Sequence, residues 1–171
     1  MLEVEWALPA FSKSFNHDER DPLVLAIFGS GWSESRVSSW ITLDQWQINE
    51  FGKLTRDEQF IHVDPVEAIS GPFGGTIAHG FLVLSLLSTM AFEALPEIEG
   101  STSKINYGFN KVRFLSPVRC GSSVRGQFTL QSLMEKKPGQ WLMISDVVVE
   151  VRDEPNPALV AEWMTLTICS S

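Results

Sequence analysis

The chain has 171 residues, of which 44% are apolar and 20% are charged, and its formal net charge at neutral pH is −8. This length and composition fit one globular domain with a full hydrophobic core, which we take to span residues 1–171. The acidic charge argues against nucleic-acid binding, which requires a basic surface, so an anionic ligand would need a local basic patch.

The sequence suggests neither export nor membrane insertion. Residues 1–10 lack the basic start and the apolar stretch of a signal peptide. The longest apolar run, residues 80–95, is interrupted by serine, threonine and glutamate, and it is too short and too polar to span a bilayer. Cys120 and Cys169 have no metal-ligand spacing, and reduced thiols are favoured over a disulfide between them, which stays open. We expect a soluble cytoplasmic protein without membrane contact.

The first third of the chain predicts short elements. We interpret residues 1–33 as a short helix or an arm that ends at glycines. Residues 35–42 predict a short strand or an extended lead-in. The pattern Thr42-x-x-Gln45 matches a capping box, which predicts a helix over residues 44–54.

Two further helices are predicted around a glycine-rich loop. Asp64 before Pro65 is typical of a helix start, because aspartate caps free N–H groups and proline fits the first turn. This helix is short because residues 70–75 combine glycines with a proline, in a tight bend rather than a phosphate loop. An apolar helix over about residues 78–95 follows and ends before Pro96.

The second half of the chain is rich in residues that favour strands. Apolar and polar residues alternate with a period of two over residues 124–131, as in a half-buried strand. Turn residues such as those at 137–139 and 153–157 separate the segments. The pattern predicts an α+β fold in which a buried helix is followed by an antiparallel sheet. The four predicted strands are residues 103–115, 123–134, 141–152 and 158–169.

Residues 57–80 contain the residue types of a proton-transfer site. The Asp57 carboxylate and a neutral His62 imidazole can hold one water between them, and one can take its proton while the other gives one. The N–H of Gly80, at the start of the apolar helix, can bind a developing oxyanion. We interpret the adjacent His79 as structural, either bonding the loop or capping the helix. Taken singly, Asp57 would be a solvated loop residue and His62 a structural histidine.

Two long motifs resemble the MaoC-like dehydratase family, most of all its NodN-like branch. They are Phe51-x3-Thr55-x-Asp57-x-Gln59-x-Ile61-His62-x-Asp64-Pro65 and Gly71-Pro-Phe-Gly-Gly-Thr-Ile-Ala-His79-Gly80-Phe81, and the run over residues 106–114 is also similar. The resemblance extends from about residue 35 to the C-terminus. It implies a single hotdog fold, in which a long central helix is wrapped by a curved antiparallel sheet. It also implies (R)-specific enoyl-CoA hydratase chemistry and a homodimer or larger homo-oligomer.

The resemblance assigns the catalytic aspartate to Asp57, the catalytic histidine to His62 and the oxyanion glycine to Gly80. The family's motif asparagine and proline are replaced by Gln59 and Phe60, changes that fit the NodN-like branch. Arg56 stands where the family usually has glycine, and it could lower the pKa of Asp57 or contact an anionic substrate. The expected reaction needs no metal, and coenzyme A enters only as part of the substrate.

Other residues are candidates for substrate binding. Ser88 corresponds to a substrate-lining serine of the family, although a core serine bonded to its own backbone is an equal alternative. Asn106, Lys111 and Arg113 share one predicted strand and would hold a coenzyme A phosphate or a partner subunit, or else form a solvated edge. The full substrate-binding set is Arg56, Gln59, Phe60, His79, Ser88, Asn106, Lys111 and Arg113.

Three functions are compatible with these residues. The first is a hydratase or dehydratase acting on an acyl-CoA or acyl-carrier-protein thioester, which the order of Asp57 and His62 favours. The second is a hotdog thioesterase, and the third is a subunit that binds acyl thioesters without catalysis, which Arg56 and the Gln59-Phe60 pair keep open. The sequence does not locate the walls that would set the length of the acyl chain.

Overall fold

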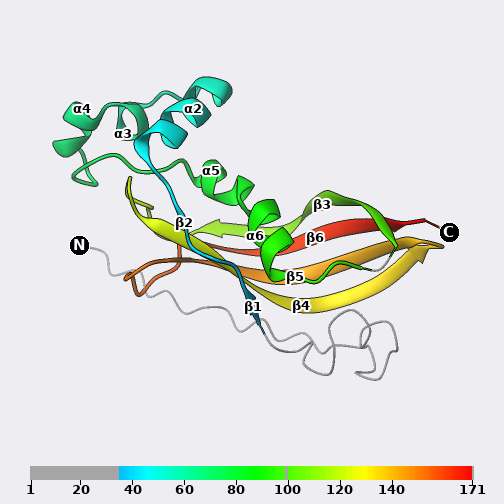
Figure 1. The fold of residues 1–171 in the computed structure, drawn as a ribbon. Helices are drawn as coiled ribbons and strands as arrows, with labels where there is room; N and C mark the ends of the chain where they lie inside the picture. The colour runs from blue at the N-terminus through cyan, green and yellow to red at the C-terminus, as the bar shows by residue number, and fades with distance from the viewer. Residues whose placement is uncertain (1–34, 99, 171) are drawn as a thin grey trace.

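The structure, a computed structural model, describes residues 35–98 and 100–170, so the predictions for residues 1–33 lie outside the described residues. The described chain forms one antiparallel sheet with helices on one of its faces (Figure 1). The strands are β1 (Arg36–Val37), β2 (Ile41–Thr42), β3 (Ser101–Phe114), β4 (Ser123–Lys137), β5 (Gln140–Val151) and β6 (Leu159–Cys169). The helices are α2 (Gln45–Thr55), α3 (Phe60–Val63), α4 (Pro65–Ile69), α5 (Gly80–Ser85) and α6 (Leu87–Ala94).

The sheet has the strand order β1-β4-β5-β6-β3, and β2 also pairs with β4. All four long strands confirm the predicted segments, and the long strands pair antiparallel with their neighbours. The strand β3 directly precedes β4 in the chain, but it lies at the end of the order beside β6. This antiparallel sheet packed against a central helical segment is a hotdog fold, as predicted.

The central helix differs from the prediction of one continuous helix over residues 78–95. It consists of α5 and α6, separated at Leu86, whose N–H is donated to Val83 O at 3.3 Å as in a tighter turn. The Ser85 hydroxyl donates to Leu82 O at 2.7 Å and competes for the backbone carbonyls of the helix. Such serine back-bonding is known to bend helices, and it accounts for the interruption.

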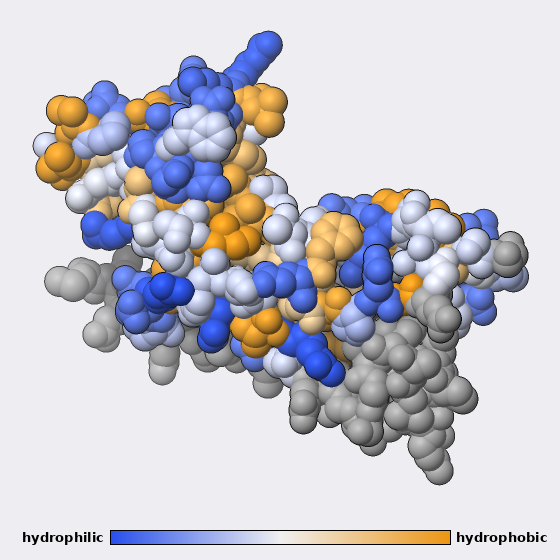
Figure 2. Space-filling view, viewed as in Figure 1, coloured by the Kyte–Doolittle hydropathy of each residue, from blue (hydrophilic) through white to orange (hydrophobic). Residues whose placement is uncertain are grey.

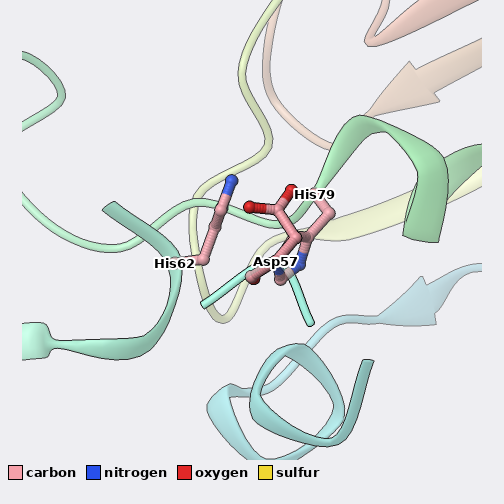
Figure 3. Close-up of side chains that lie close together, drawn as sticks. All are labelled: Asp57, His62 and His79. Atoms are coloured by element: carbon pink, nitrogen blue, oxygen red, sulfur yellow. The ribbon is translucent and has the colours of Figure 1, made fainter. Parts of the chain in front are cut away.

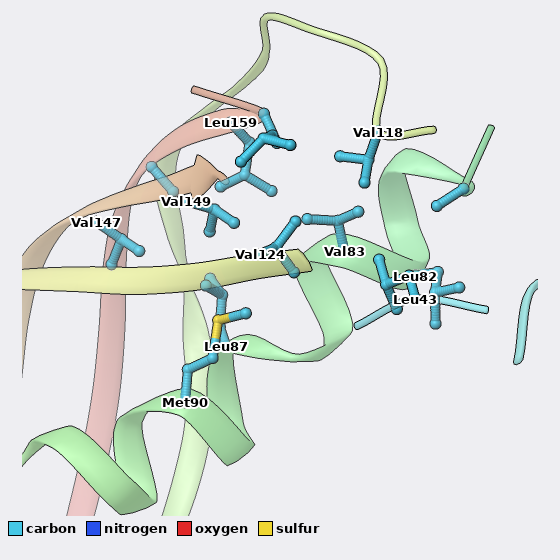
Figure 4. Packing of buried hydrophobic residues seen from close by; sticks show 14 of the residues in the cluster. Leu43, Leu82, Val83, Leu87, Met90, Val118, Val124, Val147, Val149 and Leu159 are labelled. Atoms are coloured by element: carbon cyan, nitrogen blue, oxygen red, sulfur yellow. The ribbon is translucent and has the colours of Figure 1, made fainter. Parts of the chain in front are cut away.

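The core lies between the helical segment and the sheet. Leu87 and Met90 of α6 face Val124, Val147 and Val149 of β4 and β5, and all five residues are at most 1% exposed (Figure 4). Along most of β4 and along β5 every second residue is buried, which explains the period of two in the sequence. Burying one such side chain contributes roughly 1.5–3 kcal/mol, so this layer holds α5 and α6 in place.

The N-terminal caps of α2 and α4 correct one prediction and confirm another. The capping box is formed by Asp44 and Gln47, and not by Thr42 and Gln45. Asp44 Oδ1 accepts from Gln47 N at 2.9 Å, and Gln47 Oε1 accepts from Asp44 N at 3.0 Å. Asp64 caps α4 as predicted, through Val66 N and Glu67 N. The four-residue helix α3 was not predicted, because residues 60–63 are too few to show a period.

None of the helices in the described residues is long and apolar enough to cross a membrane. Cys120 and Cys169 are both free thiols, as favoured by the sequence.

A carboxylate pair lies on β5 and β6, where Asp146 stands opposite Glu162 in the strand register. Burial, followed by the neighbouring charge of Glu162, raises the pKa of Asp146 to about 6, against the opposing hydrogen bond from Gln131. The folded protein therefore binds a proton at Asp146 more readily than the unfolded chain does, whose ordinary value is 3.8. Ionisation of Asp146 destabilises the fold, and this loss grows as the pH rises through about 6.

Asp146→Asn removes the ionisation, so its stabilising effect should appear as the pH rises above 3.8 and be complete above about 6. We expect a gain of about 1 kcal/mol at pH 7.5, after discounting the shift for partial exposure, and little difference at pH 3, below the ordinary pKa of aspartate. Urea unfolding of both proteins at the two pH values measures this. A gain that is equal at both pH values would contradict the assignment.

Candidate active site

Asp57, His62 and His79 come together although they belong to three elements. Asp57 lies in the loop between α2 and α3, His62 lies in α3, and His79 is the N-cap residue of α5. One side-chain ligand atom of each lies within 4.8 Å of the others, and Figure 3 shows the Asp57 carboxylate beside both rings. The rings are buried, whereas Asp57 remains accessible to solvent. The structure thus unites the predicted acid and imidazole, and adds a second imidazole.

His62 is held in one tautomer by the backbone. Its Nδ1 lies 2.7 Å from Ile77 O, and because a carbonyl oxygen only accepts, Nδ1 carries the proton. Nε2 is then left with a lone pair. Burial lowers the pKa of His62, the bond to Ile77 opposes this, and the neighbouring His79 lowers the pKa further. A neutral ring with a free lone pair is the form that a general base requires.

Gln45 was missed by the sequence analysis as a site residue, although it joins the parts of the site. Its Nε2 donates to His62 O at 2.7 Å, and its Oε1 accepts from the Thr76 hydroxyl at 2.5 Å. Ile77 N donates to Ile61 O at 3.0 Å, which ties the same segment to α3. These contacts fix the His62 backbone against the segment that contains Ile77 and His79.

The backbone explains why the family usually has glycine at the position of Arg56. Arg56 is the C-cap residue of α2 and has a φ of 63°, a left-handed conformation that favours glycine. The family's usual glycine would therefore adopt this turn with less strain. Among the described residues Arg56 forms no ion pair with Asp57. Gln59 Nε2 donates to Asp57 Oδ1 at 3.1 Å and orients that carboxylate.

Gly80 opens α5, where its N–H has no acceptor within the helix. A Cβ atom built on Gly80 would lie 2.9 Å from the ring of Phe114, so only glycine allows the ring this close. Gly80, His62 and Phe114 line a cavity of about 250 Å³ together with Phe73, Ile77 and Val83. Figure 2 shows the surface hollowed between the α2–α4 segment and the α6 end of the molecule, with hydrophobic residues in the hollow. Phe114 and Phe73 were not predicted as site residues.

The remaining candidates do not line this cavity. The Ser88 hydroxyl accepts from Asn106 Nδ2 at 3.1 Å and donates to Asn106 Oδ1 at 3.4 Å, and not to its own backbone. Lys111 lies opposite Glu162 in the register, and Arg113 donates to Val112 O at 3.2 Å. Phe60 and Gln59 are exposed at the start of α3. Their predicted roles in substrate binding stay predictions.

Three nearby ligand atoms raise the question of a metal site at Asp57, His62 and His79. The two imidazoles are stacked, with ring centroids 3.8 Å apart and planes at 25°. The lone pairs of stacked rings run side by side and do not converge on one ion. Moreover, His62 Nδ1 and His79 Nε2 are already occupied by backbone carbonyls. The geometry favours proton transfer over metal binding.

Similarity to known proteins shows which family the chain belongs to. Nodulation protein N of Rhizobium leguminosarum bv. viciae is 49% identical over 130 residues, covering 75% of this chain and 81% of that protein. The 3-hydroxyacyl-thioester dehydratase Z of Mycobacterium tuberculosis is 43% identical over 125 residues, covering 73% of this chain and 82% of that protein.

The fold agrees with this placement. The solved structure of the (R)-hydratase from A. caviae involved in PHA biosynthesis aligns with a TM-score of 0.64 at 22% identity, covering 78% of this chain and 93% of the other. The model of the family described as MaoC like domain matches residues 33–152. The chain therefore belongs to the MaoC-like dehydratase family.

Proposed function

We propose that this protein is a hydratase or dehydratase of the (R)-specific enoyl-CoA hydratase type. Its substrate would be a 2-enoyl or 3-hydroxyacyl thioester. The observation that carries the proposal is the meeting of the Asp57 carboxylate with a neutral His62, beside a cavity that reaches Gly80. The relative named 3-hydroxyacyl-thioester dehydratase Z supports the same substrate class.

The reaction follows from these three groups. A water held between Asp57 and His62 attacks C3 of the enoyl thioester, and His62 Nε2 takes its proton. The electrons move toward the thioester oxygen, where the Gly80 N–H stabilises the enolate-like charge. A proton then reaches C2 from the same acid–base pair, and the 3-hydroxyacyl thioester forms. Because acid and base lie on one side of the substrate, hydrogen and hydroxyl add to the same face.

The test uses crotonyl-CoA with the purified chain. Loss of the enoyl absorbance without release of thiol, giving the (R)-3-hydroxy product, is the expected result. Release of thiol would instead identify a thioesterase, and no change in either signal would point to a binding subunit. Both of these outcomes would contradict the proposed function.

We also propose that two copies associate through β3. One edge of this strand has no neighbour among the described residues, and exposed apolar side chains lie along it. An unpaired apolar edge favours pairing with another strand. Ile105, Tyr107 and Phe109 are 44%, 49% and 37% exposed.

Ile105→Lys should weaken this association, because it places a charge on each of two facing edges. We expect a dimer for the parent and a shift toward monomer for the variant in light scattering after size-exclusion chromatography. Leu54→Lys, on the distant helix α2, is the matched control and should leave the dimer intact. A monomeric parent at tens of micromolar would exclude the proposed association.

A further inference from the structure

His79 has contacts that the reaction above does not use. Its ring is only 2% exposed, and it stacks on His62 with a centroid separation of 3.8 Å. Its Nε2 lies 2.8 Å from the backbone oxygen of Asp57. Phe51 packs against the same imidazole, with ring centroids 5.2 Å apart. One buried side chain therefore contacts both members of the acid–base pair.

The hydrogen bonds of His79 fix its tautomer and leave one atom without a partner. The carbonyl oxygen of Asp57 only accepts, so Nε2 carries the proton and Nδ1 keeps the lone pair. Nδ1 is buried and has no hydrogen-bond partner in the described part of the chain. Leaving a buried polar atom without a hydrogen bond destabilises the folded protein. An apolar ring would fill the space at lower cost, so stability alone does not explain a histidine here.

We propose that His79 is a positioning residue that sets the acid and the base together, by stacking on the His62 ring and by holding the backbone oxygen of Asp57. This inference rests on the proposed function for its catalytic meaning. The stack and the bond are independent contacts, so each can be removed while the other is kept.

The surroundings explain why both contacts are needed. The Nδ1 bond to Ile77 O stops His62 from turning in its own plane, and the stack with His79 fixes the tilt of that plane. Asp57 follows the strained turn at Arg56 and lies in a loop, where its backbone needs a tether. Gly52 leaves room for that tether, because a Cβ there would lie 3.1 Å from Asp57 O and 3.5 Å from His79 Cε1.

Two substitutions separate the contacts. His79→Phe keeps a flat ring against His62 but has no donor for Asp57 O, whereas His79→Gln keeps an N–H donor but has no ring. We expect each to lower kcat for crotonyl-CoA by at least about tenfold, because misplaced acid–base groups lose rate. KM should change less than about threefold, since His79 acts through the pair and not on the substrate.

NMR of the imidazoles gives a readout that does not depend on activity. The chain has only three histidines, so ¹⁵N-labelled rings can be assigned with His17→Gln and His79→Gln. The parent should show His62 protonated at Nδ1 and His79 at Nε2. Asp57 and His79 are the titratable groups that act on His62, so His79→Gln should raise the pKa of His62. Phe51→Leu, which contacts neither Asp57 nor His62 through a ring stack or hydrogen bond, is the control and should leave the tautomers unchanged.

The proposal is overturned if both folded variants keep kcat within threefold of the parent, or if His79 is protonated at Nδ1 instead of Nε2. If the parent does not hydrate crotonyl-CoA at all, the proposed function fails separately. The His62 tautomer and its titration in His79→Gln then still decide whether His79 positions that ring.

Discussion

Asp57→Asn is expected to lower kcat/KM for hydration of crotonyl-CoA by at least about a hundredfold, since it removes one acid–base partner. Asparagine keeps the size of the side chain and its acceptor oxygen for Gln59, so the loop should retain its shape. Only the ability of the carboxylate to accept and return a proton is lost. Initial rates at saturating and limiting substrate, with a thermal unfolding curve for each protein, measure the effect.

Asp64→Asn is the matched control for this variant. Asp64 lies in the same segment but caps α4, a role that asparagine fills equally well. This control should keep the stability and the activity of the parent. Near-parent activity in Asp57→Asn would remove Asp57 from the mechanism.

His62→Gln should reduce kcat/KM by at least about a hundredfold as well, because glutamine cannot accept the proton of the attacking water at neutral pH. The parent should also lose activity at acidic pH, as His62 becomes protonated. Burial lowers the pKa of His62 from its ordinary 6.5, so this loss should set in below pH 6.5. The remaining activity of the variant should lack this acidic limb. An unchanged limb in His62→Gln would assign the titration to another group.

The sheet was predictable because its signal repeats. Alternation over residues 124–131 marks β4 in any context, since one face of the strand must be apolar. The boundaries of the helices were harder to predict from the sequence. The break at Leu86 depends on one serine hydroxyl, and the cap at Asp44 competes with an equally plausible pattern at Thr42. Local sequence offers both options, and only tertiary packing selects one.

The candidate site was predictable where it rests on a contiguous motif, as for Asp57 and His62. Its supporting contacts join positions far apart in sequence and give no local pattern. Gln45 bonds Thr76 and His62, and Phe114 packs on Gly80 from another strand. His79 was expected to bond the loop, and it does so, but its stacking on His62 follows only from the fold.

The stereochemistry of addition tests the central claim most directly, because two groups on one face of the substrate can deliver water only to that face. Crotonyl-CoA turned over in deuterium oxide should give a single (R)-3-hydroxybutyryl thioester with deuterium at C2, added syn to the new hydroxyl, as read from proton NMR coupling constants. An anti product, or a mixture of both C2 diastereomers formed at the rate of turnover, would contradict a mechanism in which Asp57 and His62 act together on one bound water.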